Sequence, residues 1–292
     1  MPEPLLPRRP LGKTGLQVAP IGLAALAVRG TRRRGGPGLT ADEVERAFHE
    51  HGINTFLVHH LMRRQGEGVR RLIKAGHRDQ LVLVSEVAIP LAGAVRRGLD
   101  RQLRALGTDH LDVWLIGWLR SRFYARPSVW STMERLRQAG LTRAIGFSSH
   151  DRPLATALAQ ELPVDVLMIR YNAAHRGAER EIFAPLAELG DRRPGIIAYT
   201  ATRWGMLLDP LPSRGFPTAL SAPECYRFVL GPPEVDLVWC AATSMDELRE
   251  DVAAVAAGPL SAARRAEACR FGDAVHDAAR GGFRWMFGRG AG

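Results

Sequence analysis

The stretch Gly52-Ile53-Asn54-Thr55-Phe56-Leu57-Val58-His59-His60-Leu61-Met62 decides how this chain is interpreted. Residues 53–58 form a short, mostly apolar run that ends at two histidines. A continuous apolar run of this length is typical of a strand that is covered on both of its faces. We therefore predict a buried strand here, of the kind found in parallel sheets.

Seven other segments have the same character and recur along the chain. They are predicted as strands at Ile21–Ala25, Leu81–Glu86, Leu111–Gly117, Arg143–Ser148, Val164–Arg170, Gly195–Thr200 and Leu237–Ala241. Amphipathic segments lie between them, and one begins with the capping box Thr40-Ala41-Asp42-Glu43. Further helices are predicted at Ala94–Leu106, Ser128–Gln138, Ser221–Leu230, Ser244–Ala257 and from Pro259 to about Ala279.

This alternation of strands and helices favours an α/β fold, the (β/α)₈ or TIM barrel, which typically needs about 250 residues. The segment Arg9–Val18 adds an N-terminal β-hairpin, and a helix follows the last strand. A doubly wound sheet is the alternative, but it usually has a glycine-rich turn after its first strand and an acid about 20 residues later, which this chain lacks. No linker or repeat divides residues 1–292, so we expect a single domain.

The composition restricts the class of protein. The net charge is +10, and every basic residue except Lys13 and Lys74 is an arginine. No helix-turn-helix, zinc finger or aromatic-interleaved basic pattern accompanies this charge, so no nucleic-acid partner is expected. No long apolar run predicts a membrane span, and the first residues do not resemble a secretory signal. The 3 cysteines form no metal or disulfide motif, so we expect a reducing cytoplasm and no metal site.

Several segments together resemble the aldo-keto reductase family. The stretch at 52–62 is similar to the family's second barrel strand, which reads Gly-Ile-Asn, two apolar residues, Asp-Thr-Ala, two variable residues and Tyr. Further similar segments are Leu11–Leu23, Leu106–Ile116, Ala144–Ser149, Tyr171-Asn172, Ala198–Thr200 and Gly205–Leu207. Each is weak alone, whereas their order and spacing cover nearly the whole chain. The resemblance implies a barrel whose site lies at the C-terminal ends of the strands.

The resemblance also implies which residues should carry carbonyl reduction. In the family, a Tyr donates a proton to the carbonyl oxygen, a nearby Lys lowers the pKa of that Tyr, an Asp pairs with the Lys, and a His helps hold the carbonyl. Position by position, the Asp is Leu57, the Tyr is Met62, the Lys is Glu86 and the His is Gly117. The resemblance therefore implies a divergent member without this tetrad, a pseudoenzyme for that reaction.

Some cofactor positions implied by the resemblance are kept. Ser148 and Ser149 occupy positions that hold the nicotinamide carboxamide, and Tyr199 is where an aromatic ring stacks on the nicotinamide. Thr200 and Ser244 lie on the two loops that would contact the rest of a dinucleotide. These five residues are the predicted cofactor site.

Other cofactor positions are changed. Met168 replaces a Gln that binds the carboxamide, and Glu247 and Asp251 stand where the family serves the adenosine end. Two carboxylates beside a 2′-phosphate would be repulsive, by about 1 kcal/mol each in water. The sequence therefore predicts a weakened site for NADP or NAD.

Two residues near the vacated tetrad carry the remaining chemistry. His59 and His60 follow the second strand, and strand alternation places His59 on the same side as Leu57. Because histidine titrates near neutral pH, His59 is a candidate replacement acid. Glu86 should either hold a proton or find a cation, such as His59. A His59–Glu86 pair could transfer a proton without hydride, or it could only repair the vacated site.

Arginines recur on segments expected at the mouth of the barrel. They are Arg32, Arg33, Arg34, Arg63, Arg64, Arg120, Arg122, Arg170, Arg176 and Arg203. This set predicts an electropositive mouth for an anionic ligand, and a chain-wide arginine bias is the alternative. We predict Trp118, Tyr124, Arg170 and Arg203 as ligand-pocket residues. Trp114, Trp130 and Cys240 are expected in the core.

Three functions remain open at this stage. The first is a barrel that binds a small ligand, with NAD(P)(H) as one candidate, and lacks the standard reduction machinery. The second is an active NAD(P)H-dependent oxidoreductase that uses a replacement acid such as His59. The third is a non-catalytic scaffold that binds a partner protein. A fold does not by itself establish a function, so the chemistry of the residues at the mouth of the barrel has to distinguish these three functions.

Overall fold

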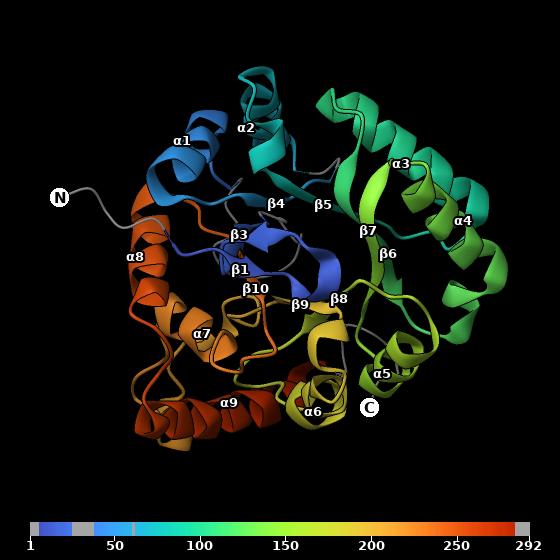
Figure 1. Ribbon diagram of the computed structural model, residues 1–292. Coiled ribbons are helices and arrows are strands. Elements are labelled where there is room, and N and C mark those ends of the chain that lie inside the picture. The colour runs from blue at the N-terminus through green and yellow to red at the C-terminus, as the bar shows by residue number, and fades with distance from the viewer. Residues whose placement is uncertain (1–5, 25–37, 60–61, 284–292) are drawn as a thin grey trace.

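The computed structural model describes residues 6–24, 38–59 and 62–283. Within these residues, eight parallel strands close into a barrel, in which each strand pairs with its neighbours in sequence and the last pairs with the first (Figure 1). The strands are β3 (Ile21–Leu23), β4 (Thr55–Leu57), β5 (Val82–Val87), β6 (Leu111–Leu119), β7 (Thr142–Ser149), β8 (Val166–Arg170), β9 (Gly195–Tyr199) and β10 (Leu237–Cys240).

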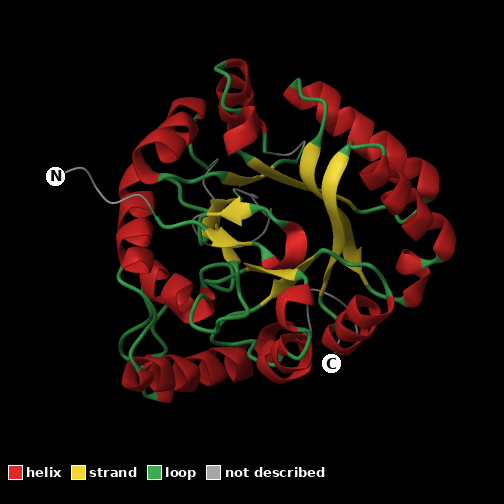
Figure 2. Ribbon diagram, viewed as in Figure 1, coloured by secondary structure: helices red, strands yellow, loops and turns green. Residues whose placement is uncertain are grey.

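Helices form an outer ring around the barrel (Figure 2). They are α1 (Ala41–His51), α2 (Arg63–Lys74), α3 (Ala92–Leu106), α4 (Pro127–Gln138), α5 (Arg152–Glu161), α6 (Ala184–Ala187), α7 (Ala222–Val229), α8 (Met245–Ala256) and α9 (Ala262–Phe283). The fold is therefore the predicted (β/α)₈ barrel, and the closed ring excludes a doubly wound sheet. No helix of the described residues is long and apolar enough to cross a membrane.

The predicted elements are confirmed, with corrections at some ends. All eight predicted strands are present, and Thr40 and Glu43 form the predicted capping box of α1. Arg63 and Arg64 were predicted on a loop, but they lie in the first turn of α2, because the chain enters this helix directly after Met62. Helices α5 and α6 were not predicted, and α9 continues past Ala279 to Phe283.

The N-terminal hairpin closes one end of the barrel. Strands β1 (Arg9–Pro10) and β2 (Gln17–Val18) pair antiparallel, and Figure 1 shows them at the centre of the ring. The N–H of Lys13 donates to the carbonyl of Arg193 over 3.0 Å. A β-carbon on Gly12, which has φ +48°, would lie 2.2 Å from the backbone nitrogen of Gly195, so only glycine allows this approach. The mouth therefore lies at the opposite end.

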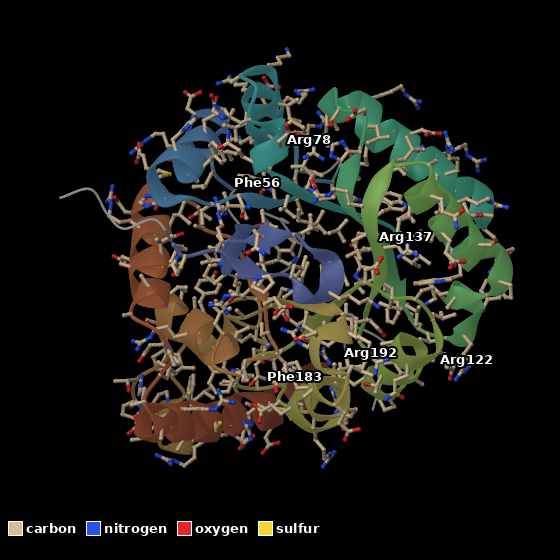
Figure 3. The ribbon with its side chains drawn as sticks, viewed as in Figure 1. Phe56, Arg78, Arg122, Arg137, Phe183 and Arg192 are labelled. Atoms are coloured by element: carbon tan, nitrogen blue, oxygen red, sulfur yellow. The ribbon has the colours of Figure 1, made fainter. Side chains whose placement is uncertain are left out.

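Four polar side chains fix the strands near the hairpin end. Each accepts a hydrogen bond from a backbone N–H in the preceding strand or just before it. The N–H groups of Ala19, Leu83, Ile145 and Ile196 donate to Asn54, Asp112, Asp165 and Asp236, respectively. Arginines neutralise the three carboxylates: Arg78 binds Asp112, Arg137 binds Asp165 and Arg193 binds Asp236 (Figure 3 labels Arg78 and Arg137). The hairpin end is thus a structural end, with its buried charges paired.

The interior of the barrel is apolar. Side chains from the strands and the hairpin form one cluster, here called the lumen cluster, which consists of Leu11, Leu16, Val18, Ala24, Leu57, Met62, Val82, Val84, Val113, Leu115, Ala144, Val166, Met168, Ile197, Leu237 and Trp239. A second, larger cluster packs the outside of the strands against the helices. The lumen cluster is therefore the floor on which any site at the mouth rests.

Candidate functional site

Leu57 and Met62, the two positions on the β4 side that the resemblance assigns to the tetrad, are apolar and filled. Leu57 and Met62 are both buried and belong to the lumen cluster. The N–H of Met62 donates to the carbonyl of His59 over 2.8 Å, which turns the chain into α2. These positions offer packing surface and no ionisable group.

Glu86, at the end of β5, fills the space that Gly117 leaves on β6. A β-carbon added to Gly117 would lie 3.1 Å from both Cδ and Oε2 of Glu86. The Ser148 hydroxyl donates to Oε2 over 3.1 Å, and the N–H of Trp118 donates to the Ser148 oxygen over 2.7 Å. The hydrogen bond from Trp118 to Ser148 and the one from Ser148 to Glu86 therefore hold the carboxyl group beside Gly117.

The carboxyl group of Glu86 has no described cationic partner. Burial raises its pKa, and the hydrogen bond from Ser148 offsets this only in part. The predicted His59–Glu86 pair is not among the described contacts of Glu86, whose hydrogen bond is with Ser148. His59 is half-buried, and His60 lies outside the described residues. Glu86 therefore favours its protonated form more than an exposed glutamate does.

Tyr199 lies at the end of β9, directly paired with Arg170 of β8. Its ring meets His150 edge to face, with ring centroids 5.6 Å apart, and its hydroxyl lies 3.4 Å from the carbonyl of Ser149. Burial raises the pKa of Tyr199, the charge of Arg170 opposes this and the charge of Glu86 adds to it. Tyr199 thus connects the acidic and basic sides of the mouth electrostatically.

Arg203, after β9, is a buried cation with unused donors. It is only 6% exposed, and its Nε and Nη1 atoms have no hydrogen-bond partner among the described residues. Burial, with a smaller contribution from Arg170, lowers its pKa to about 10. Arg170 is partly buried, which lowers its pKa as well, and it has no described carboxylate partner. Two guanidinium groups therefore stand near each other without a described counter-ion.

The loop that carries Arg203 has an unusual backbone. Thr200, Arg203 and Trp204 have φ values of 59°, 51° and 55°. This left-handed region is unfavourable for residues with a β-carbon, particularly for branched and bulky side chains. Such conformations cost on the order of 1–3 kcal/mol each and concentrate at functional sites. The loop therefore combines backbone strain with a buried, unpaired charge.

Two histidines complete the basic surroundings. Burial, then Arg170 and Arg120, lowers the pKa of His150 to about 4. Burial, then Arg170, Arg203, His276 and Arg152, lowers the pKa of His175 to about 2. Both imidazoles are therefore neutral near neutral pH. The sequence reasoning missed them, although they follow β7 and β8 as closely as some of the arginines that it selected.

The other arginines predicted at the mouth contribute less. Arg122 forms two hydrogen bonds with Glu161, of 2.5 and 2.7 Å. Arg176 donates to the carbonyl of Ala173 and to Asp273. Arg120 is exposed, and the predicted Arg32, Arg33 and Arg34 lie outside the described residues. Arg170 and Arg203 are the pair on which an anion site would depend.

The hydroxyl groups predicted to bind a cofactor all have protein partners. Besides Ser148, the Ser149 hydroxyl donates to the carbonyl of Leu119 over 2.8 Å, and the Thr200 hydroxyl donates to the carbonyl of Tyr199 over 2.6 Å. Ser244 is the N-cap of α8 and accepts the N–H of Glu247 over 3.2 Å.

Three replaced cofactor positions are also engaged within the protein. The sulfur of Met168 accepts the indole N–H of Trp239 over 3.1 Å. Glu247 accepts the N–H and the hydroxyl of Thr243 over 2.8 and 2.9 Å. Asp251 is buried, accepts a hydrogen bond from the Cys240 thiol over 3.4 Å, and has a pKa that burial raises to about 7. The expectation that Asp251 faces a 2′-phosphate is therefore wrong, because its side chain points into the protein.

The aromatic residues on the β6 side divide into two groups. Trp118 is 43% exposed, with φ 51°, at an irregularity in the β6–β7 pairing between Ile116 and Leu119. Tyr124 packs instead against the cluster outside the barrel. Trp114, Trp130 and Cys240 are buried, as predicted.

A cavity of about 400 Å³ lies outside the barrel, between the π-helix Glu179–Phe183, α7 and the start of α9. Three of its four charged groups are already engaged: Arg265 binds Glu179, and Arg227 donates to the carbonyls of Gly258 and Pro259. Among the described residues, no group of three or more His, Cys, Asp or Glu side chains could hold a metal ion. The mouth remains the candidate site.

Comparison with known proteins gives consistent matches. A model of the Aldo/keto reductase family matches residues 41–210. Aldo-keto reductase YhdN of Bacillus subtilis (strain 168) is 24% identical over 210 residues, covering 68% of this chain and 62% of that protein. The (1S)-1,7-diacetoxy-luvungin A aldo-keto reductase of Citrus sinensis is 26% identical over 160 residues, covering 43% of this chain and 49% of that protein. The chain thus matches about half to three fifths of the length of these relatives.

A solved structure gives the same fold. The holo form of the aldo-keto reductase AKR11C1 from Bacillus halodurans superposes with a TM-score of 0.73 at 22% identity, covering 91% of this chain and 96% of that one. The thermostable aldo-keto reductase Tm1743, in complex with the inhibitor epalrestat, gives 0.65 at 22% identity, covering 92% and 99%. At such identities the likeness concerns the fold alone.

Proposed function

Because the chain belongs to the aldo/keto reductase family, we propose that it keeps the family's barrel as a binding site for a small anionic ligand and lacks the Asp, Tyr, Lys and His machinery of carbonyl reduction. The observation that carries this proposal is Arg203, a buried guanidinium whose Nε and Nη1 have no described partner. A second cation, Arg170, lies close enough to lower its pKa.

Burial of an unpaired charge is costly, and the cost rises when a like charge is near. At the hairpin end, by contrast, arginines neutralise the carboxylates of Asp112, Asp165 and Asp236. A phosphate or carboxylate at the mouth would supply the missing acceptors for Arg203 and offset the repulsion from Arg170. The mouth is therefore suited to an anion.

The family's nicotinamide cofactor is a poorer fit. When bound, NAD(P)H supplies hydride, and its carboxamide needs free donors and acceptors at the mouth. Ser148 and Ser149 are engaged with Glu86 and Leu119, and Met168 offers only a thioether that already accepts from Trp239. Tyr199 is in edge contact with His150. A weakened nicotinamide end is therefore part of the proposal.

A second candidate function is an oxidoreductase with a replacement acid, and the position of Glu86 favours it. Its carboxyl group lies beside Gly117, where the family's His is lost, and burial raises its pKa. Proton donation by a well-placed acid typically contributes about 10²–10⁴-fold to a rate. Glu86 would be the proton donor of this second candidate.

The two functions are separated by titrating the purified protein with inorganic phosphate, NADH and NADPH at low and moderate salt. Anion binding that weakens with salt and disappears in Arg203→Met supports the proposed function. Oxidation of NADPH in the presence of an aldehyde or quinone, at a rate that falls in Glu86→Gln, supports the second candidate. Absence of any salt-sensitive anion binding contradicts the proposed function.

A further inference from the structure

We infer that the ligand of the mouth is an organic acid with a flat apolar body, whose acidic group binds Arg170 and Arg203 and whose body lies against Trp118 over the apolar floor of Leu57 and Met62. This inference rests on the proposed anion site and adds the chemical class of the ligand.

Two neighbouring arginines would bind the acidic group of the ligand. Arg170 is the last residue of β8, and Arg203 follows β9 on a loop with three left-handed residues. Histidines 150 and 175 stand beside these arginines and are neutral near neutral pH. No described carboxylate pairs with either arginine. The acidic group of a ligand would therefore bind on the side of the mouth formed by the ends of β8 and β9.

Trp118 would contact the apolar body of the ligand. This indole is 43% exposed on a residue with φ 51°, so the backbone adopts an unfavourable conformation without burying the ring. The N–H of Trp118 donates to Ser148 over 2.7 Å, which holds the irregular end of β6 in place. Exposed Ile89 and Leu91 follow the neighbouring strand β5. An exposed aromatic ring on a strained backbone is suited to contact an apolar ligand.

The floor between the two ends is uncharged at its centre. Leu57 and Met62 replace the ionisable residues that the family places there, and both pack into the lumen cluster. Glu86 lies on this floor, where burial favours its neutral form, so it would repel an acid less than an exposed carboxylate does. A neutral carbonyl compound would find no phenol at Met62 and would leave the arginines unpaired.

The strand order limits the size of the ligand. Trp118 is the next-to-last residue of β6 and Arg170 is the last residue of β8, with only β7 between these strands. Neighbouring strands lie about 4.8 Å apart, so these two ends are separated by about 10 Å at the barrel wall. A carboxylate on one or two fused rings spans such a distance, whereas acetate or phosphate reaches only the arginines.

The test compares four probes by isothermal titration calorimetry: inorganic phosphate, acetate, 2-naphthoate and the neutral 2-naphthamide. We expect 2-naphthoate to bind at least about tenfold more tightly than acetate or phosphate, because the rings bury apolar area. The neutral amide should bind at least about tenfold more weakly than 2-naphthoate. Trp118→Ala should remove most of the gain for 2-naphthoate and leave phosphate unchanged, and Trp118→Phe should restore part of it.

The outcomes separate this inference from the proposed function. If phosphate and acetate bind as tightly as 2-naphthoate, and Trp118→Ala changes none of them, the anion site stands and the ligand class is wrong. If none of the acids binds, the proposed function fails first. If NADPH binds more tightly than the acids and 2-naphthoate does not compete with it, the inference is also overturned. Arg203→Met, with its fold checked by circular dichroism, should abolish binding of every acid.

Discussion

The carboxyl group of Glu86 on β5 lies against Gly117 on β6: a β-carbon on Gly117 would meet Cδ of Glu86 at 3.1 Å. In the resemblance to the aldo-keto reductases, these two positions belong to a Lys and a His. In this chain, the side chain of Glu86 occupies space beside a residue that has no side chain on the next strand.

This pairing predicts a non-additive double mutant. Gly117→Ala should destabilise the protein by up to about 1 kcal/mol, because the carboxyl group must shift away from its hydrogen bond with Ser148. In a Glu86→Ala background, the same substitution should cost less, since the conflicting atoms are gone. Urea unfolding of the four proteins measures the coupling. Gly66→Ala is the control, because no atom lies within 4 Å of its added β-carbon. Equal costs in both backgrounds would contradict the pairing.

The fold was predictable because its signals are local. Apolar runs marked all eight strands, and caps such as Thr40 with Glu43 marked helix starts. The site was less predictable, because its chemistry depends on which neighbouring strand fills a space. The sequence placed Glu86 at the mouth but not over Gly117, and it placed Asp251 near a cofactor although the side chain is buried against Cys240.

The same distinction explains the histidines. The rule that selected Arg170, proximity to the end of a strand, applies equally to His150 and His175. Their neutral state, however, depends on burial and on arginines from other strands. No local pattern in the sequence reports those distances.

The buried acid Asp251 predicts a pH dependence of stability. Burial raises its pKa in the folded protein to about 7, above the ordinary value of 3.8, so the folded protein holds this proton more tightly than the unfolded chain does. Stability should therefore fall as pH rises from about 4 to 7, by at most about 4 kcal/mol for this group. Asp251→Asn should remove much of that fall, as measured by urea unfolding at pH 5 and pH 8. Exposed Asp191→Asn is the control. A wild-type stability that rises over this range, with no difference in Asp251→Asn, would refute the assignment.

The buried contacts of Asp112 predict how much the hairpin end contributes to the stability of the protein. This fully buried carboxylate accepts the N–H of Leu83 and pairs with Arg78 and Arg143. Asp112→Ala should destabilise the protein by about 3–5 kcal/mol, because it leaves the charge of Arg78 without its carboxylate and the N–H of Leu83 without its acceptor. Asp109→Ala, on a side chain that is 91% exposed, should change little. The midpoints of thermal unfolding compare the two, and equal midpoints would show that the buried contacts contribute nothing.

His150 predicts how anion binding depends on pH. Its pKa is about 4 in the free protein, and an anion beside Arg170 would raise it by removing part of the repulsion. Affinity should therefore be nearly constant from pH 6 to 8 and should increase as pH falls below about 5, with uptake of a proton. Protonation of Glu86, which interacts with neighbouring Tyr199, would act in the same direction. His150→Asn separates the two, because it should flatten the low-pH rise by the share that belongs to the imidazole. An identical pH profile in that variant would leave His150 without a role.

Arg203 makes the sharpest prediction, because binding and stability should change in opposite directions. Its guanidinium is buried without described partners for two of its nitrogens, so removing the charge should stabilise the free protein by about 1–3 kcal/mol. The same Arg203→Met substitution should abolish binding of phosphate and of aryl acids, since Arg170 alone is more exposed to solvent. Arg180→Met, on a side chain that is 86% exposed, should alter neither property. Thermal unfolding without ligand, followed by calorimetric titration, measures both. A variant that is less stable and binds anions normally would mean that Arg203 supports the loop rather than a ligand.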